Sequence, residues 1–170
     1  MTSKQMLQWI IGIMLVMGTL VGCGVAQVKP QPGATFSGPL ELIRSGTNGK
    51  VSSGELEITI AEDGTSIISV TFSLSNMICS NESGGIKITS DGFSTTTTFS
   101  QPAAIANGKF ELDIGGSDEE IRIDGQFTSP TEANATVQIS TTTIVAPPGT
   151  SLRESISCDY GSWNWSGEVK

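Results

Sequence analysis

Apolar and polar residues alternate one by one along most of the chain, and this repeat of two residues is the feature that most constrains its fold. Leu56, Ile58 and Ile60, for example, fall on one face of an extended chain, with polar residues on the other. Beyond residue 22, no stretch of about 11 residues keeps the apolar repeat of an amphipathic helix. The alternation predicts β-strands within 55–60, 68–74, 86–88, 93–99, 109–114, 121–127, 135–139 and 163–169.

Turn residues separate these alternating runs. Asp63-Gly64 and Asn107-Gly108 each stand between two of them, and both dipeptides favour tight hairpins. The chain also holds 22 Ser and 19 Thr among its 170 residues, and small hydroxyl residues favour strands, turns and solvated surfaces over helices. We therefore predict an all-β fold, an antiparallel two-sheet β-sandwich of about eight or nine strands.

The N-terminal segment has the order of a secretory signal. Residues 1–22 carry one charge, Lys4, ahead of an apolar run and a small-residue exit. The stretch 20–23, which reads Leu-Val-Gly-Cys, resembles the lipobox of bacterial lipoproteins. The resemblance implies cleavage before Cys23 and lipid on that residue. A plain transmembrane anchor or an ordinary cleaved signal is the alternative, although the apolar run is short for a spanning helix.

This interpretation divides the chain into three parts. Residues 1–22 are expected to form a signal peptide that is helical, and 23–38 to form the lipidated cysteine and a flexible tether, because the prolines and glycines there follow no repeat. Residues 39–170 are expected to form the β-sandwich. Loss of Lys4 with the signal leaves 8 basic and 17 acidic residues, so that the net charge changes from −8 to −9.

Three cysteines fit an exported protein. If Cys23 carries lipid, Cys79 and Cys158 remain as a pair in an oxidising compartment, where disulfides persist. A bond between them would close a loop of 79 residues. Two free buried thiols are the alternative.

A set of short motifs resembles an uncharacterised β-sandwich domain of secreted bacterial proteins. The motifs are the strand before Asp63-Gly64, the Asn107-Gly108 hairpin, a Gly125-x-Phe127 strand and a terminal strand that holds Cys158, Gly161 and Trp165. The resemblance implies the sandwich fold and a paired Cys79 and Cys158, and it contributes no catalytic residue. This chain departs from the pattern by an insertion at 145–157 and by Trp163 in place of a smaller apolar residue.

Composition excludes several chemistries. With no His, the chain has no imidazole base and no His-containing triad or zinc site. The acidic balance argues against nucleic acid, whose phosphates require clustered Lys and Arg. We therefore expect no enzymatic activity and no cofactor.

Two weak ligand sites stand out in the sequence. Asp118, Glu119 and Glu120 lie in an acidic hairpin that would supply oxygen ligands for Ca²⁺, although solvated surface acids are the simpler interpretation. Trp163 and Trp165 fall on one face of the last strand, where they would either stack on sugars or fill the core, and we favour the core.

Together these features predict a lipoprotein anchored to the membrane through Cys23 and facing the exterior or the periplasm of the cell envelope. The expected function is that of a non-enzymatic structural or protein-interaction module, with the 145–157 loop as one possible binding site for an envelope protein. The alternative function is carbohydrate binding through Trp163 and Trp165.

Overall fold

The computed structural model describes residues 27–83, 86–89, 93–100, 102–116, 118–145 and 154–170. Within these ranges the chain forms strands and turns and no helix, so the all-β prediction is confirmed. The expected signal helix, the lipobox with Cys23 and the middle of the 145–157 segment lie outside the described residues. In the part of the chain that is described, no helix is long and apolar enough to span a membrane.

Seven of the eight predicted strands begin within three residues of their expected start. The last strand begins at Glu154, nine residues early, so that both ends of the expected 145–157 loop are strand residues that pair with each other. The strands at 35–45, 49–50 and 103–104 were not predicted. In chain order the strands are β1 (Thr35–Ser45), β2 (Gly49–Lys50), β3 (Ser53–Ile60), β4 (Ser66–Ser83), β5 (Ile86–Thr89), β6 (Phe93–Phe99), β7 (Ala103–Ala104), β8 (Lys109–Gly115), β9 (Glu119–Ser129), β10 (Glu132–Val145) and β11 (Glu154–Val169).

Two irregularities in β4 explain why the predicted direction of Ile68 and the predicted end of this strand were wrong. Ile68 was expected to point inward but is exposed, because the register with β3 shifts at Ile60 and Ile67 enters the core instead. The alternation also breaks near Asn76, whose φ of 52° accompanies a second register shift. That shift returns Met77 to the core, so the strand continues past its expected end.

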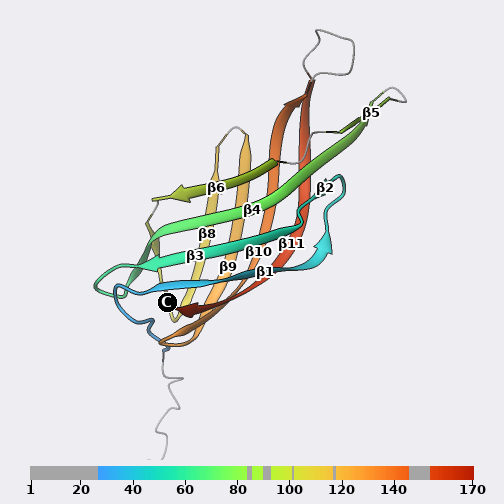
Figure 1. Ribbon diagram of the computed structural model, residues 1–170. Helices are drawn as coiled ribbons and strands as arrows, with labels where there is room; N and C mark the ends of the chain where they lie inside the picture. The colour runs from blue at the N-terminus through green and yellow to red at the C-terminus, as the bar shows by residue number, and fades with distance from the viewer. Residues whose placement is uncertain (1–26, 84–85, 90–92, 101, 117, 146–153) are drawn as a thin grey trace, which may run out of the picture.

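All these strands belong to one open antiparallel sheet, in the order β2-β4-β3-β1-β11-β10-β9-β8, with β5, β6 and β7 also paired to β4. We call β6, β4, β3 and β1 the N-terminal half of the sheet and β11, β10, β9 and β8 the C-terminal half. The strands of the two halves cross one another in Figure 1. The two separate sheets expected from the sequence are not observed, because β1 pairs along β11 and joins the halves.

The apolar faces of the two halves pack against each other. The ring of Phe36 in β1 meets that of Phe127 in β9 edge-on, with 5.2 Å between centroids, and Phe127 lies 5.2 Å from Phe110 in β8. The indole N–H of Trp165 in β11 donates a hydrogen bond of 3.0 Å to the carbonyl oxygen of Leu56 in β3. Aromatic packing and this bond therefore tie the two halves together.

Both predicted turns are present. At Asp63-Gly64, Gly64 has a φ of 67° and its N–H donates to the carbonyl oxygen of Ala61 at 2.9 Å. Asn107 and Gly108 have φ values of 56° and 73°, and the flanking Ala106 and Lys109 exchange two backbone hydrogen bonds of 2.9 Å. This geometry is that of a two-residue hairpin turn whose central residues are both left-handed.

The folded region starts before the predicted boundary at residue 39. β1 begins at Thr35, and the backbone N–H of Gln31 already donates to the carbonyl oxygen of Pro130 at 2.8 Å. The predicted boundary between the tether and the sandwich falls between Gly38 and Pro39, yet both residues lie inside a central strand, β1. The ladder with β11 is interrupted at these two residues, which accommodates a proline that has no N–H to donate.

A disulfide between Cys79 in β4 and Cys158 in β11 also joins the two halves. Next to it, the carboxylate of Asp159 accepts hydrogen bonds from the N–H and hydroxyl of Thr47, at 3.2 and 3.1 Å, and from the N–H of Gly161 at 2.8 Å. The bonds from Gly161 and Thr47 hold the pKa of Asp159 below its ordinary value. The connection between β1 and β2 is thereby fastened to β11.

Candidate functional site

Two rows of polar side chains cross the outer face of the C-terminal half. Residues opposite each other on neighbouring antiparallel strands point to the same face and lie side by side. The first row consists of Lys109, Gln126, Asn134 and Ser166. The second row continues onto β1 and consists of Glu111, Asp124, Thr136, Asn164 and Glu41.

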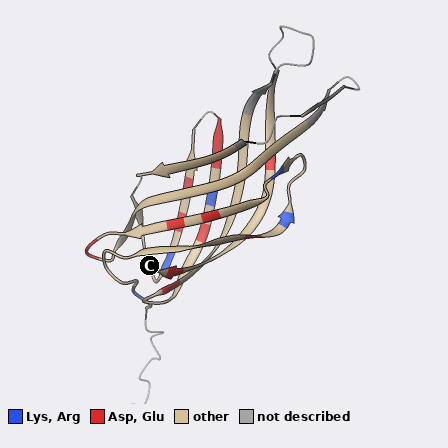
Figure 2. Cartoon of the chain, in the orientation of Figure 1, with Lys and Arg blue, Asp and Glu red and all other residues tan. Residues whose placement is uncertain are grey.

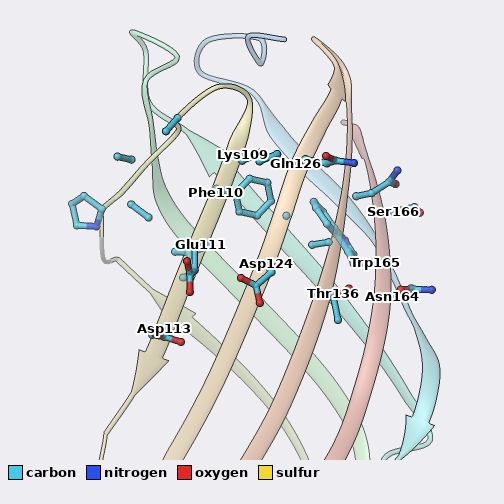
Figure 3. A pocket seen from close by; sticks show the side chains of 18 of the residues that line it. Lys109, Phe110, Glu111, Asp113, Asp124, Gln126, Thr136, Asn164, Trp165 and Ser166 are labelled. Carbon is cyan, nitrogen blue, oxygen red and sulfur yellow. The ribbon is translucent and has the colours of Figure 1, made fainter. Parts of the chain in front are cut away.

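Both rows line a hollow of about 1150 Å³, which we call the polar groove. The lining also includes Leu112 and the residues of the row between the two polar rows, which are Phe110, Gly125, Ala135 and Trp165. The border of the groove beyond β8 is formed by the short residues Pro102, Ala103, Ala104 and Ala106. Figure 3 shows side chains of both rows on β8, β9, β10 and β11. Strand twist makes such sheets saddle-shaped, so that an outer face can be concave along one direction.

Acidic groups outnumber basic ones in the polar groove. Arg122 in β9 contacts Oε1 of Glu111 through Nη2 at 2.6 Å and Oδ2 of Asp124 through Nε at 3.3 Å. The carboxylates of Asp124, Glu111 and Asp113, in decreasing order of effect, raise the pKa of Arg122. Figure 2 shows acidic and basic residues side by side on β8 and β9. Arg122 thus pairs with two of the three carboxylates and lies opposite the third, Asp113. The groove itself is lined by four acidic residues and one basic residue, Lys109, so it keeps an excess of negative charge.

The neutral side chains of the groove are not engaged within the protein. Gln126, Asn134, Thr136, Asn164 and Ser166 make no side-chain hydrogen bond with any other described residue. Amides and hydroxyls in this condition bond to water and are available to donors and acceptors of a ligand. The groove therefore offers an uncommitted polar surface with an acidic side at β8 and β9.

Trp163 and Trp165 are core residues. Trp163 is 4% exposed and Trp165 is 1% exposed. The indole N–H of Trp163 donates a hydrogen bond to the carbonyl oxygen of Tyr160 at 3.2 Å. A buried indole has no free face for a sugar ring, because stacking requires direct contact with the ring.

The acidic residues considered for Ca²⁺ do not form a cluster. Glu119 and Glu120 are neighbours in β9 and so point to opposite faces of the sheet, with Asp118 just before the strand. Partial burial raises the pKa of Glu119. No three His, Cys, Asp or Glu side chains in the described ranges are close enough together to hold a metal ion.

The polar groove was not predicted from the sequence, although the outward direction of its residues was. Gln126 and Thr136 are ten positions apart in the sequence. The pairing of β9 with β10 places Gln126 opposite Asn134 and Asp124 opposite Thr136, which brings the two polar rows side by side. Alternation assigns a residue to a face, but it does not say which strands lie side by side.

Comparison with protein-family models, with curated proteins and with solved structures found no match for the chain. The resemblance to a secreted β-sandwich domain therefore stays a prediction.

Proposed function

We propose that this protein is a lipid-anchored component of the bacterial cell envelope that binds a partner protein, without catalysis, through the polar groove. The observation that carries the proposal is the set of uncommitted amides and hydroxyls in a hollow of about 1150 Å³. Surfaces of this kind contribute direct and water-bridged hydrogen bonds to protein interfaces.

The expected lipid attachment would hold this groove close to the membrane. Gln27, whose side chain donates to Oδ1 of Asn107, comes four residues after Cys23. Because an extended chain spans at most about 3.6 Å per residue, a chain of four residues would keep the lipid attachment within ~14 Å of Gln27. Asn107 is two residues from Lys109, where the first row of the groove begins. A partner would therefore be met at the membrane surface, on the exterior or periplasmic side.

The anchor is tested by replacing Cys23 with Ser in cells that naturally produce the protein. Metabolic labelling with an alkyne-tagged fatty acid should label the unaltered chain and not the Cys23→Ser variant. The variant should also leave the membrane fraction. A label that persists in Cys23→Ser would contradict lipidation at this residue.

The groove is tested with one charge introduced on each half of the sheet. Gln126→Arg places a long cation in the groove, and Thr96→Arg places it on the exposed outer face of β6 as the matched control. Proteins that co-purify with the chain from detergent-solubilised envelopes should be lost with Gln126→Arg and retained with Thr96→Arg. Equal retention would contradict the proposal. Release by soluble envelope oligosaccharides would favour the alternative, glycan binding.

A further inference from the structure

β8 is an edge strand whose outer side is open over most of its length. Among the described residues it pairs along its length with β9, and on its other side the single bridge joins Lys109 to Ala106. From there the chain of β7 turns away to pair with Ser66 and Ile67 of β4. The polar groove runs up to this edge, where the short residues from Pro102 to Ala106 border it.

The backbone groups at the open side can be assigned from the bridge. Lys109 directs its N–H and carbonyl oxygen toward Ala106, away from β9. In an antiparallel strand these directions alternate from residue to residue, so Glu111 and Asp113 direct their N–H and carbonyl groups to the same open side. Even-numbered residues direct these groups toward β9 instead, and Gly116 accordingly donates its N–H to the carbonyl oxygen of Glu119 at the start of β9. An incoming strand would therefore find the N–H and carbonyl groups of Glu111 and Asp113, followed by those of Gly115 at the end of β8.

Three features that prevent strand addition, namely prolines, bulges and very short length, are absent from this edge, so that its protection consists of the charged side chains of Lys109, Glu111 and Asp113. β8 is seven residues long, contains no proline and pairs with β9 without a register shift. The opposite edge of the sheet, β6, differs because its register with β4 shifts between Leu74 and Met77. The regular edge at β8 is thus the better template.

Charge on β8 indicates which strand would fit. Lys109, Glu111 and Asp113 point to the outer face, with Lys109 next to the turn and bonded to Ala106, and Phe110 and Leu112 point to the core. A second copy of β8 paired about a two-fold axis at Leu112 would place Glu111 opposite Asp113, which repels. A strand with Lys or Arg at its outward positions and apolar residues between them would instead meet opposite charges and continue the core face.

We propose that an extended, alternating basic and apolar segment of a partner protein adds as a strand to β8. This inference rests on the proposed function, because it names the partner's chemistry and the way in which it meets the edge of the polar groove. Main-chain hydrogen bonds provide the attachment and the alternating side chains provide the selectivity, as in other cases of strand addition.

The test uses the full chain, labelled with ¹⁵N in detergent micelles, and a synthetic peptide that alternates lysine and valine. Added peptide should slow amide hydrogen exchange at Glu111 and Asp113 by at least about tenfold, because these N–H groups become hydrogen-bonded. A peptide that alternates glutamate and valine should give no protection. No protection by the lysine peptide at millimolar concentration, or equal protection by both peptides, would overturn the proposal.

Two variants separate the contribution of the backbone N–H of Asp113 to peptide binding from that of its carboxylate charge. Asp113→Pro removes the outward N–H and leaves the bonds to β9, since proline is tolerated where the N–H faces solvent. Asp113→Asn removes the charge and keeps the N–H. We expect Asp113→Pro to weaken peptide binding by about tenfold or more and Asp113→Asn by only about two- to threefold. Unchanged melting temperatures show that both variants fold, and equal binding by the two would overturn strand addition.

Failure here is distinguishable from failure of the proposed function. If Gln126→Arg abolishes partner binding while Asp113→Pro does not, the groove binds its partner by side chains alone and strand addition is wrong. If neither variant affects partner binding, the proposed function itself fails.

Discussion

The two halves of the sheet treat their outer polar groups differently. In the N-terminal half, hydroxyls on neighbouring strands bond to each other, as with Thr71 and Thr98 at 2.9 Å and Ser73 and Thr96 at 3.2 Å. In the C-terminal half, the amides and hydroxyls of the polar groove have no partner among the described residues. The outer polar groups of the N-terminal half therefore form hydrogen bonds with one another, whereas those of the polar groove remain available to a ligand.

The contacts that hold the halves together lie elsewhere, on the inner faces and at the β1–β2 connection. The disulfide, the bond from Trp165 to Leu56 and the bonds from Thr47 to Asp159 all cross from one half to the other. Stability and binding are thus assigned to different residues. Substitutions at the crossing contacts should destabilise the fold, whereas substitutions on either outer face should not.

The largest effect is expected from the disulfide. Replacing Cys79 and Cys158 with Ala should lower the free energy of unfolding by roughly 2 to 5 kcal/mol, because the unfolded chain is no longer constrained by a long loop. Urea unfolding of both proteins, with and without reductant, measures this. Reductant should destabilise only the parent chain. A parent chain indifferent to reductant would contradict the role of the bond.

Trp165→Phe should give the next largest loss. The variant keeps an aromatic ring in the core but removes the donor to Leu56 and some packing volume, at a cost of about 1 to 3 kcal/mol. Trp163→Phe is the control, since its indole donates to Tyr160 within β11. Equal losses in the two variants, measured by urea unfolding, would argue against a special role for the bond between the halves.

Asp159 should contribute a smaller, pH-dependent effect. Its folded pKa lies below the unfolded value of about 3.8, so its contribution is present above that value and disappears as the pH falls through the folded pKa. Asp159→Asn should be less stable than the parent near neutral pH, and the difference should shrink toward about pH 2. If the difference in stability between Asp159→Asn and the parent does not change with pH, the loss in the variant has a cause other than the removed charge.

Outer-face substitutions should have the smallest effect on stability. Thr71→Val in the N-terminal half and Gln126→Ala in the groove should each change the free energy of unfolding by no more than about 0.5 kcal/mol. Thermal unfolding of the two variants checks this. A large loss with Gln126→Ala would mean that the groove helps to hold the fold, which would remove the distinction between the halves.

Local sequence predicted the parts of the fold that depend on local chemistry. Phe93–Phe99 matches the expected strand, and Asn107-Gly108 forms the expected turn, because alternation and left-handed turn residues act over a few positions. The Cys79 and Cys158 disulfide was reached by counting cysteines.

Features that depend on distant pairing were not predicted. Gly38-Pro39 concealed β1, and the alternation gave no sign that β1 would pair with β11 and make one sheet of the two halves. The polar groove depends on the same information, since its rows exist only in the register of five strands. Register is a tertiary property that alternation leaves open.

Site-specific photo-crosslinking in living cells tests the central claim, that the C-terminal half binds the partner, most directly. A photoreactive amino acid at Gln126 is compared with one at Thr96, both on exposed outer faces. The account predicts a discrete crosslinked product from position 126 and none from position 96. The same product from both positions, or a product from position 96 alone, would contradict it.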